Sequence, residues 1–358
     1  MEVVMAGLLT PLDRYTSEAA EALVRKERNG AIRCLACGHR CVVEPNRRGA
    51  CKVRFVEGET LKVPFGYVAG VQVDPIEKKP FFHVLPGASA LSFGMLGCDL
   101  KCPYCQNWLT SQALKDPAAT ESLRPIDAAD LVEAARRYDC AIICSTYNEP
   151  LITAEWSAAV FDRAREAGLL TAFVSNGNAT PEVLDFLRPR LDMIKIDLKA
   201  MNQSAYRQLG GSLARVLDSI SEVVTRGFHT EIVTLIVPEW NDDEEEIRRM
   251  ARFLAGIDPE IPWHLTAFHP DYKMRDKRAT QPEDLLRLFE TAREEGMRYV
   301  YCGNRPGRVG RTEDTACAGC GAVLVERRHF QVFSCRVTRE GRCPDCGRKI
   351  PGVWKRNL

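Results

Sequence analysis

The 358-residue sequence has no long hydrophobic run, little net charge and no repeated or low-complexity segment. No apolar stretch in it approaches the ~18 residues that a membrane-spanning helix needs. The first 30 residues lack the pattern of a secretory signal. We therefore expect a protein of the cytoplasm without a membrane span. The formal net charge of +1 also argues against a dominant phosphate-binding surface.

A GxGxxG turn is also missing after the first expected strand, which disfavours a doubly wound dinucleotide-binding fold. Short β-rich runs instead alternate with amphipathic helical segments. Strands are expected at 90–93, 141–146, 170–174, 193–198, 231–237, 263–268 and 298–301, and helices at 128–137, 155–167, 181–187, 213–226, 243–254 and 282–294. Consecutive βα units predict an α/β fold with a parallel sheet, as a full or partial (β/α) barrel. Functional side chains then belong at the carboxyl ends of the strands.

Cysteine is unusually frequent in this sequence. The chain has fifteen cysteines, enough apolar residues for its own core and no secretory signal, so metal ligation is a better first hypothesis than disulfides. Eleven of the cysteines form three tight groups, and these groups divide the chain into three expected parts. The parts are an N-terminal segment with a cysteine-rich metal-binding motif (1–85), a barrel (86–305) and a C-terminal CxxC/CxxC metal-binding module (306–358).

The middle group, Cys98, Cys102 and Cys105, directly follows the first expected strand. Three thiolates at spacings of four and three can hold three corners of a [4Fe–4S] cluster, whose fourth iron then needs a ligand from elsewhere. On spacing alone, a zinc ion completed by a distant Cys or His is the alternative.

The CxxxCxxC spacing, with Tyr104 before the third cysteine, resembles the radical S-adenosylmethionine (radical SAM) superfamily. The resemblance implies that the amino and carboxylate groups of SAM chelate the open iron, and it displaces the zinc alternative. Further marks at the ends of later strands resemble the pyruvate formate-lyase activating enzyme branch. The residues that this resemblance assigns to SAM binding are Tyr104, Tyr147, Asn148, Glu149, Ser175, Asn176, Asp197, Lys199 and His269.

Within that set, the superfamily's Gly-Gly-Glu motif reads Tyr147-Asn148-Glu149 in this chain. Glu149 is therefore the one residue of this motif that matches the superfamily, and the resemblance implies that it accepts a hydrogen bond from the methionine ammonium of SAM. Lys199 is expected to face the carboxylate or ribose of SAM on the same basis.

Longer parts of the chain resemble one subfamily, the AmmeMemoRadiSam system radical SAM enzymes. The matching segments lie at 34–41, 74–80, 146–150, 268–272, 343–347 and 351–354, and the resemblance runs from about residue 30 to the end. It implies Memo-like and AMMECR-like proteins as partners, and the reaction implies an external low-potential electron donor. The resemblance leaves the substrate open.

The C-terminal group, Cys317, Cys320, Cys343 and Cys346, has the spacing of a zinc ribbon or rubredoxin-like knuckle pair. A glycine follows each CxxC pair, which lets the chain turn so that backbone N–H groups point at the sulfurs. We expect structural zinc at this module, with a mononuclear iron as the alternative. Four thiolates leave no open position on the metal, so we expect no chemistry there.

The N-terminal group, Cys34, Cys37, Cys41 and Cys51, is spaced unevenly, and His39 offers a fifth candidate ligand. Uneven spacing suits either zinc or an auxiliary [4Fe–4S] cluster, and zinc is narrowly favoured.

Four cysteines lie outside the three groups. Cys140 and Cys144 flank a strand and are expected to pack as small hydrophobic residues. Cys302 is expected to face the barrel cavity from the end of the last strand, where it is a candidate radical relay or thiol donor. Cys335 falls inside the last module without belonging to its spacing.

These patterns predict a radical SAM enzyme that cleaves SAM to methionine and a 5′-deoxyadenosyl radical, which removes hydrogen from an unidentified substrate. Installation of a glycyl radical on a protein is one option. Modification of a nucleotide or RNA is another, because residues 303–358 carry 12 Lys and Arg against 5 Asp and Glu. A non-catalytic zinc scaffold that binds protein or RNA is the alternative from another class.

Overall fold

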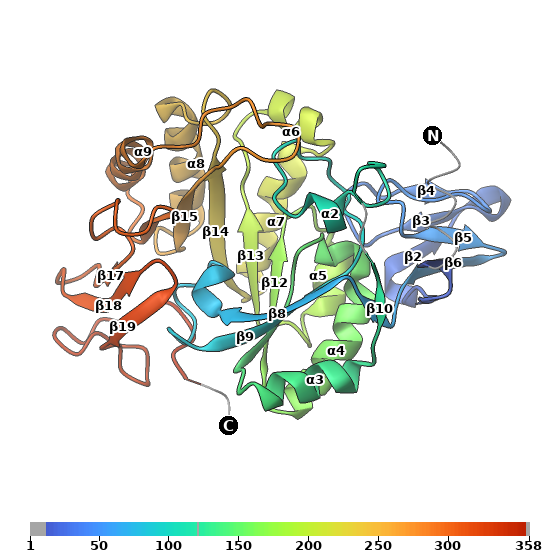
Figure 1. Cartoon of the computed structure of the whole chain (residues 1–358), viewed down its shortest axis with the longest axis horizontal. Coiled ribbons are helices and arrows are strands. Elements are labelled where there is room, and N and C mark those ends of the chain that lie inside the picture. The colour runs from blue at the N-terminus through green and yellow to red at the C-terminus, as the bar shows by residue number, and fades with distance from the viewer. Residues whose placement is uncertain (1–11, 120–121, 356–358) are drawn as a thin grey trace.

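An eight-stranded sheet forms the centre of the molecule. A computed structural model describes residues 12–119 and 122–355, and its main sheet has the order β16-β15-β14-β13-β12-β11-β9-β8. The strands are β8 (Gly70–Pro75), β9 (Ser89–Gly94), β11 (Ile142–Ser145), β12 (Leu170–Ser175), β13 (Met193–Asp197), β14 (His229–Ile236), β15 (Trp263–Ala267) and β16 (Val300–Gly303). Seven strands are parallel, and β8 pairs antiparallel with β9. No ladder within the described chain joins β8 to β16, so the sheet is a partial barrel (Figure 1).

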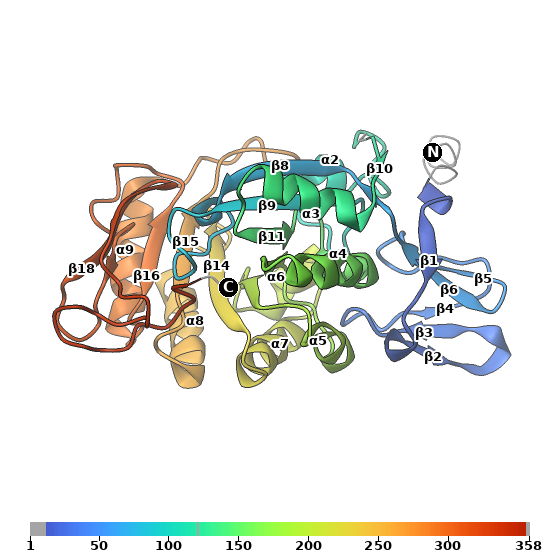
Figure 2. The same cartoon turned by 90° about the horizontal axis from the view of Figure 1, so that it is seen from below.

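Helices cover the outer face of this sheet (Figure 2). They are α3 (Ala128–Arg137), α4 (Ala154–Glu166), α5 (Pro181–Leu187), α6 (Gln203–Leu209), α7 (Leu213–Thr225), α8 (Glu244–Ile257) and α9 (Pro282–Glu294). Side chains of Thr180 and Asp243 accept N–H bonds from the first turns of α5 and α8. Between strands and helices, Phe93, Phe161 and Phe173 pack ring against ring in the largest hydrophobic core. Burial of these apolar helix faces holds the barrel together.

The N-terminal segment forms small antiparallel sheets beside the barrel. One sheet contains β1 (Thr16–Glu18), β5 (Phe55–Glu57) and β6 (Thr60–Pro64), and another contains β2 (Val24–Lys26), β3 (Ile32–Cys34) and β4 (Val42–Val43). A two-stranded sheet pairs β7 (Tyr67–Val68) with β10 (Arg124–Pro125). The fully buried Arg54 ties this segment to the barrel, since it pairs with Glu155 of α4 and donates to the carbonyl of Ile152 at 2.8 Å.

The C-terminal module is a three-stranded sheet of β17 (Thr315–Ala316), β18 (Val323–Arg328) and β19 (Gln331–Cys335), at the opposite end of the long axis from the N-terminal segment (Figures 1 and 2). Its Leu324 and Val325 share one hydrophobic core with Phe82 and Tyr301 of the barrel. Arg327, whose side chain is fully buried, donates to the carbonyl of Phe82. The module is therefore packed firmly on the barrel.

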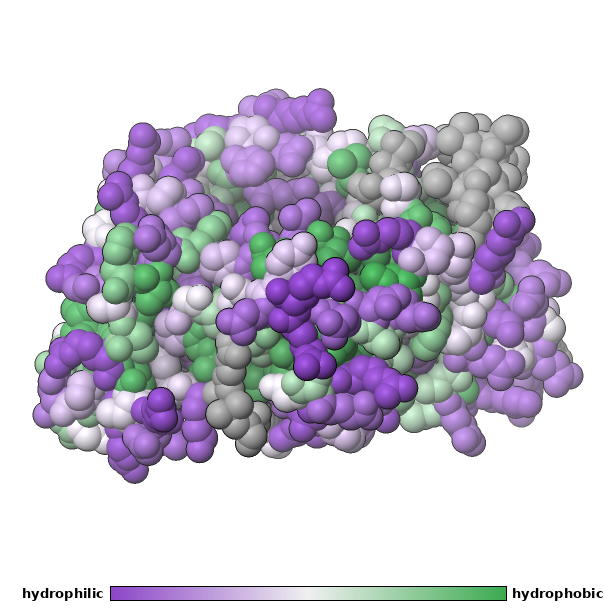
Figure 3. All heavy atoms as spheres, turned by 60° about the horizontal axis from the view of Figure 1, so that its bottom comes forward, coloured by the Kyte–Doolittle hydropathy of each residue, from purple (hydrophilic) through white to green (hydrophobic). Residues whose placement is uncertain are grey.

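No helix among the described residues is both long and apolar enough to cross a membrane. Polar and charged residues are spread over the face drawn in Figure 3, with apolar residues gathered in small patches between them.

The predicted α/β fold with a partial (β/α) barrel is confirmed. Each of the seven expected strands and six expected helices is present, and α3, α5 and α9 have the expected bounds. Strand β8 was not expected, because its side chains are mostly half-buried or exposed and give no apolar alternation. The short helices α2 (Trp108–Ser111) and α6 were also missed.

Candidate functional site

The loop after β9 carries the middle cysteines, and it leads into α2. Cys102 is buried, and Cys98 and Cys105 are partly buried. The backbone N–H of Leu100 donates to Cys98 Sγ at 3.4 Å, and Cys105 Sγ lies 3.2 Å from Ser111 Oγ. Backbone and hydroxyl groups directed at sulfur are typical of sites that stabilise thiolates bound to metal.

Burial raises the pKa of all three thiols. The pKa of Cys102 rises to about 12, and that of Cys98 lies well above its usual range because the charge of Asp99 adds to burial. Such thiols release their protons only when a cation arrives, because a metal supplies the compensating charge. The donor set therefore suits a bound metal centre and makes a free reactive thiolate unfavourable.

The barrel cysteines are less tightly gathered than the C-terminal cysteines. Among the described residues, the one group of metal-ligating side chains whose ligand atoms all lie within 4.8 Å is Cys317, Cys320, Cys343 and Cys346. The barrel cysteines are absent from that geometry. A four-iron cluster holds its ligand sulfurs farther apart than one tetrahedral ion does, because each sulfur binds a different iron. The three barrel cysteines therefore do not form a tight single-ion group of that kind.

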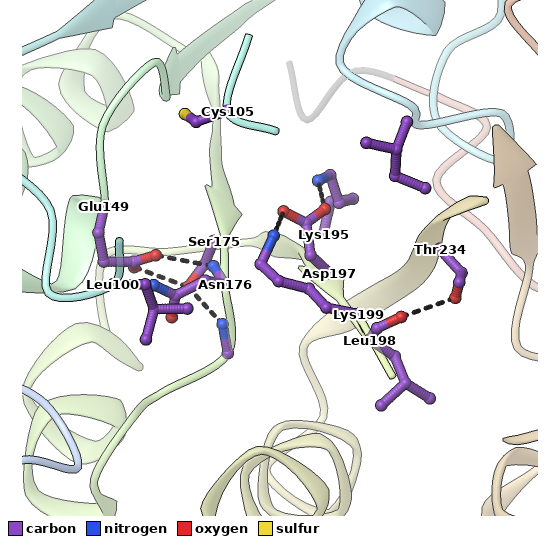
Figure 4. A network of polar contacts seen from close by, with 12 residues as sticks. Leu100, Cys105, Glu149, Ser175, Asn176, Lys195, Asp197, Leu198, Lys199 and Thr234 are labelled. Atoms are coloured by element: carbon purple, nitrogen blue, oxygen red, sulfur yellow. Dashed lines mark hydrogen bonds and ion pairs between the residues drawn. The ribbon is translucent and has the colours of Figure 1, made fainter. Parts of the chain in front are cut away.

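Glu149 lies behind this loop in a buried hydrogen-bonded cluster (Figure 4). Its carboxylate accepts from Ser175 Oγ at 2.7 Å, from the N–H of Asn176 at 2.7 Å and from the N–H of Leu151 at 3.1 Å. Asn176 Nδ2 donates in turn to Asp99 Oδ1 at 2.7 Å. Burial, reinforced by the charge of Asp99, raises the pKa of Glu149 to about 8. Four residues that were predicted separately thus meet in one network, since Asn148 Nδ2 also donates to the carbonyl of Glu149 at 3.3 Å.

Asp197, at the end of β13, pairs with two lysines (Figure 4). One is Lys195 on the same strand, and the other is Lys199, whose Nζ lies 2.9 Å from Asp197 Oδ2. Burial alone would raise the pKa of Asp197, but the two ammonium groups outweigh it and lower that pKa to about 2. The Asp197 carboxylate is therefore ionised at every physiological pH.

A cavity of about 410 Å³ opens on the concave side of the sheet. Its lining includes Cys102, Cys105, Tyr104, Tyr147, Asp197 and Lys199 from the predicted set. The same lining includes residues that the sequence did not single out, namely Glu77, Lys79, Lys195, His264, Glu313, His329 and Phe330. Inward-facing polar residues on buried parallel strands, such as Lys195 on β13, are the sequence signal that could have identified part of this wall.

The other predicted contacts lie outside this lining. Asn148, Glu149, Ser175 and Asn176 form the buried network described above. His269 is exposed on the loop after β15, and its nearest polar partner is the carbonyl of the adjacent Pro270 at 3.4 Å. The structure thus brings His269 to neither the cavity nor the network.

Tyr147 is held in an uncommon backbone conformation, with a φ of +68°. Its hydroxyl accepts from Lys79 Nζ at 3.1 Å, and its carbonyl accepts from Thr110 Oγ1 at 2.9 Å. Gly94 makes room for this turn, because a Cβ there would stand 2.5 Å from the carbonyl oxygen of Thr146 and 2.8 Å from Tyr147 Cβ. Close packing of these two strand ends fixes the tyrosine ring over the cavity.

The N-terminal cysteines lie against the same loop. The N–H of Gly38 donates to the carbonyl of Asn178 at 2.8 Å, and Asn178 Nδ2 donates to Asp99 Oδ2 at 2.7 Å. Burial and then the charge of Asp99 raise the pKa of Cys37 well above its usual range. Arg54 Nη1 contacts Cys34 Sγ at 3.7 Å. The segment that carries this motif therefore reaches Asp99, next to the first cysteine of the barrel loop.

These N-terminal sulfurs are not gathered as a single-ion site. Cys34, Cys37 and Cys51 are buried and Cys41 is half-buried, and within the part of the chain that the structure describes they do not all meet the 4.8 Å spacing. His39 Nε2 stands 4.0 Å from the Asp99 carboxylate instead of joining them.

The C-terminal cysteines are gathered closely. Cys317 Sγ lies 3.6 Å from Cys346 Sγ, and Cys320 Sγ lies 3.7 Å from Cys343 Sγ. Burial would raise the pKa of Cys317, but backbone N–H groups of Cys320 and Gly319 and the neighbouring thiols lower it to about 7. The group could bind a metal ion, and the module has the form of a zinc ribbon.

One expectation about the remaining cysteines is wrong. Cys302 is fully buried and donates to the carbonyl of Leu285 on α9, so its sulfur points to the outer helix layer and away from the cavity. Cys302 directly follows Tyr301, whose register neighbour His264 lines the cavity, and successive side chains of a strand take opposite faces. Cys140 and Cys144 are buried in hydrophobic cores as expected, and Cys335 is exposed.

The chain is similar to several known proteins. A model of the Radical SAM superfamily matches residues 94–254. The chain is 36% identical over 323 residues to an uncharacterized protein of Methanocaldococcus jannaschii, covering 89% of this chain and 95% of that one. It is 22% identical over 236 residues to pyruvate formate-lyase 1-activating enzyme of Escherichia coli, covering 60% and 93%. A crystal structure of a domain of pyruvate-formate lyase-activating enzyme from Bacteroides vulgatus gives a TM-score of 0.39 at 22% identity, over 44% of this chain and 94% of that chain.

Proposed function

Because the chain belongs to the radical SAM superfamily and is a radical SAM enzyme, we propose that Cys98, Cys102 and Cys105 hold its [4Fe–4S] cluster. When bound, the cluster supplies the electron that splits SAM into methionine and a 5′-deoxyadenosyl radical able to remove hydrogen from a substrate. The observation that carries this proposal is the position of three largely buried thiols after β9, two of which line the cavity.

The residues of this chain bind and orient SAM in the proposal. Lys199, held by Asp197 at the cavity wall, faces the carboxylate or ribose of SAM. Tyr104 and Tyr147 supply aromatic and polar surface beside the cysteines, and Tyr104 is steadied by an edge-on contact with Trp240 at 5.2 Å. Apolar walls exclude water around these groups, so that each charge interacts strongly with its partner.

Glu149 is proposed to accept from the methionine ammonium of SAM. An ionised carboxylate has about four acceptor positions, and internal donors occupy three of them in Glu149. Ser175, Asn176 and Asn148 then act by positioning Glu149 beside the cysteine loop. For His269 we retain a contact with SAM only as the resemblance implies it.

For the C-terminal group we propose structural zinc, because the four sulfurs have the spacing of a closed tetrahedral site. For the N-terminal group we propose a metal centre, either zinc or an auxiliary iron–sulfur cluster. It would lie close to Asp99, next to the first cysteine of the barrel loop.

We further propose three functional parts, a cysteine-rich N-terminal segment, a barrel and a C-terminal module, divided near residues 85 and 305. Strand β8 is then a contribution of the first part to the barrel sheet. An external low-potential electron donor serves the cluster, and Memo-like and AMMECR-like proteins are the proposed partners. Reduced thiols and an oxygen-sensitive cluster favour the cytoplasm as their compartment.

The proposal is tested on protein that is purified and assayed without oxygen. The purified protein should be brown with absorbance near 400 nm, and with a strong reductant it should convert SAM to 5′-deoxyadenosine. Replacing the three barrel cysteines by alanine should abolish that conversion and leave the metal of the C-terminal module in place. A wild-type rate in the triple variant would contradict the ligand assignment. A colourless protein that holds only zinc would instead support a non-catalytic scaffold.

A further inference from the structure

Lysine side chains are unusually frequent on the wall of the cavity. Lys79, Lys195 and Lys199 all line it, and their side chains are 4%, 5% and 13% exposed. Removing an ammonium group from water is costly unless it has partners. The charge balance around these lysines therefore indicates what the cavity binds.

Four lysine ammonium groups at this wall form ion pairs with two carboxylates. Asp197 is shared by Lys195 and Lys199, and Asp74 is shared by Lys79 at 2.9 Å and Lys78 at 2.7 Å. Each carboxylate therefore leaves one positive charge without a negative partner of its own.

The other carboxylates at or beside this wall have partners of their own. Glu77 stands 3.7 Å from Arg327, and Glu313 accepts from the N–H of His329 at 2.8 Å. Glu231 is the register neighbour of Lys195 on β14, but its oxygens already accept from the N–H groups of Phe82 and His83 and bind the rings of His229 and His264. None of these carboxylates forms an ion pair with Lys79 or Lys195 among the described residues.

Hydrogen-bond donors are also left over. An ammonium group has three N–H donors. Within the described chain, Lys195 Nζ bonds only to Asp197, and Lys79 Nζ bonds to Asp74 and Tyr147. Nearby parts of the lining, including Val174 and Val233, are apolar and offer no acceptor. Free donors on two buried cations thus face one cavity.

Lys79 and Lys195 line the same cavity. Tyr147 lines it too, and its hydroxyl accepts from Lys79 Nζ at 3.1 Å. Lys199 is already assigned to SAM, whereas Lys79 and Lys195 have no role in binding it.

We propose that Lys79 and Lys195 form an anion subsite, and that the substrate is a small molecule with a carboxylate or phosphate group. This inference rests on the proposed function, since the cavity is where hydrogen removal takes place. The cavity of about 410 Å³ suits a small molecule. Glu313, His329 and Phe330 of the C-terminal module also line it.

The experiment uses anaerobic, iron-loaded, full-length protein saturated with SAM. Inorganic phosphate and, separately, acetate are titrated in a calorimeter at constant ionic strength. We expect saturable binding that weakens about tenfold or more in Lys195→Gln and Lys79→Gln. Tighter binding of phosphate indicates a phosphorylated substrate, and tighter binding of acetate indicates a carboxylate. Lys277→Gln, a matched change at a lysine paired with Glu239 outside the cavity, should leave anion binding unchanged.

Three results would overturn the inference. The first is that neither anion binds saturably to the wild-type protein. The second is that Lys195→Gln binds the anions with the same affinity as the wild type. The third is that Lys195→Gln or Lys79→Gln loses affinity for SAM and still binds the anions. Lys195→Arg keeps the charge and should retain anion binding, so it carries the test if Lys195→Gln does not fold. SAM cleavage is measured separately, so failure of the anion site with cleavage intact overturns this inference and not the proposed function.

Discussion

Glu149 should release a proton when SAM binds. Burial and the charge of Asp99 raise the pKa of this carboxyl from 4.5 to about 8, so at pH 7 it is roughly nine-tenths protonated in the SAM-free protein. A methionine ammonium placed beside it favours the carboxylate and lowers that pKa. Binding at pH 7 should therefore release close to one proton, and binding at pH 9 should release almost none.

Calorimetry in two buffers with different ionisation enthalpies measures this release directly. Glu149→Gln should remove it and weaken SAM binding by about 2–5 kcal/mol without loss of iron, because the ammonium loses its charged partner. If the variant releases the same proton, or if the wild type releases none at pH 7, Glu149 does not bind the ammonium.

The same pKa has a consequence for stability. A carboxyl whose pKa is raised in the folded state contributes stability that is present below its unfolded pKa and is lost as pH rises through the folded pKa. For Glu149 the window runs from 4.5 to about 8, and stability falls as pH rises through it in the SAM-free protein. Urea unfolding across this range should show a flatter pH dependence in Glu149→Gln than in the wild type.

Cys343→Ser should release the metal proposed for the C-terminal module. Because Cys343 shares a core with the barrel, the variant should also have a lower melting temperature for the whole protein. A barrel transition unchanged by the loss of metal would contradict the shared packing. Gly94→Ala should destabilise the protein by about 1–3 kcal/mol, because the added Cβ crowds the neighbouring strand end. Gly256→Ala is the control, since a Cβ there meets no atom within 4 Å, and it should be neutral or stabilising. Equal urea midpoints for the two variants would refute this reasoning. Arg54→Met should cost about 3–5 kcal/mol because it leaves Glu155 buried and unpaired, and adding Glu155→Gln should recover part of that loss.

The parallel core of the fold was predictable because its signals are local. Periodic apolar residues and caps such as Thr180 determine each strand and helix from a few neighbours in sequence. Strand β8 was not predictable, because an edge strand with half-exposed side chains is fixed by its pairing to β9 and not by its own pattern. The packing of the C-terminal module on Phe82 is likewise a contact across more than 240 residues.

Residue spacing located two of the cysteine groups, and it missed several residues that line the cavity. The CxxxCxxC loop was located after the correct strand, and the four C-terminal cysteines converge as expected. The orientation of Cys302 was wrong because the register of a short strand decides which face a side chain takes, and residue spacing does not reveal that register. Lys195 was overlooked because a single lysine in an apolar run indicates burial only once the strand is known to line the barrel.

The central claim is that Cys98, Cys102 and Cys105 hold a cluster with one iron open to SAM. Electron paramagnetic resonance of the reduced, anaerobic protein before and after addition of SAM tests it most directly. The account predicts a spectrum that changes when SAM is added, and a change that is lost when the three cysteines are replaced by alanine. A wild-type spectrum that is identical with and without SAM, or the same SAM-dependent change in the triple variant, would contradict it.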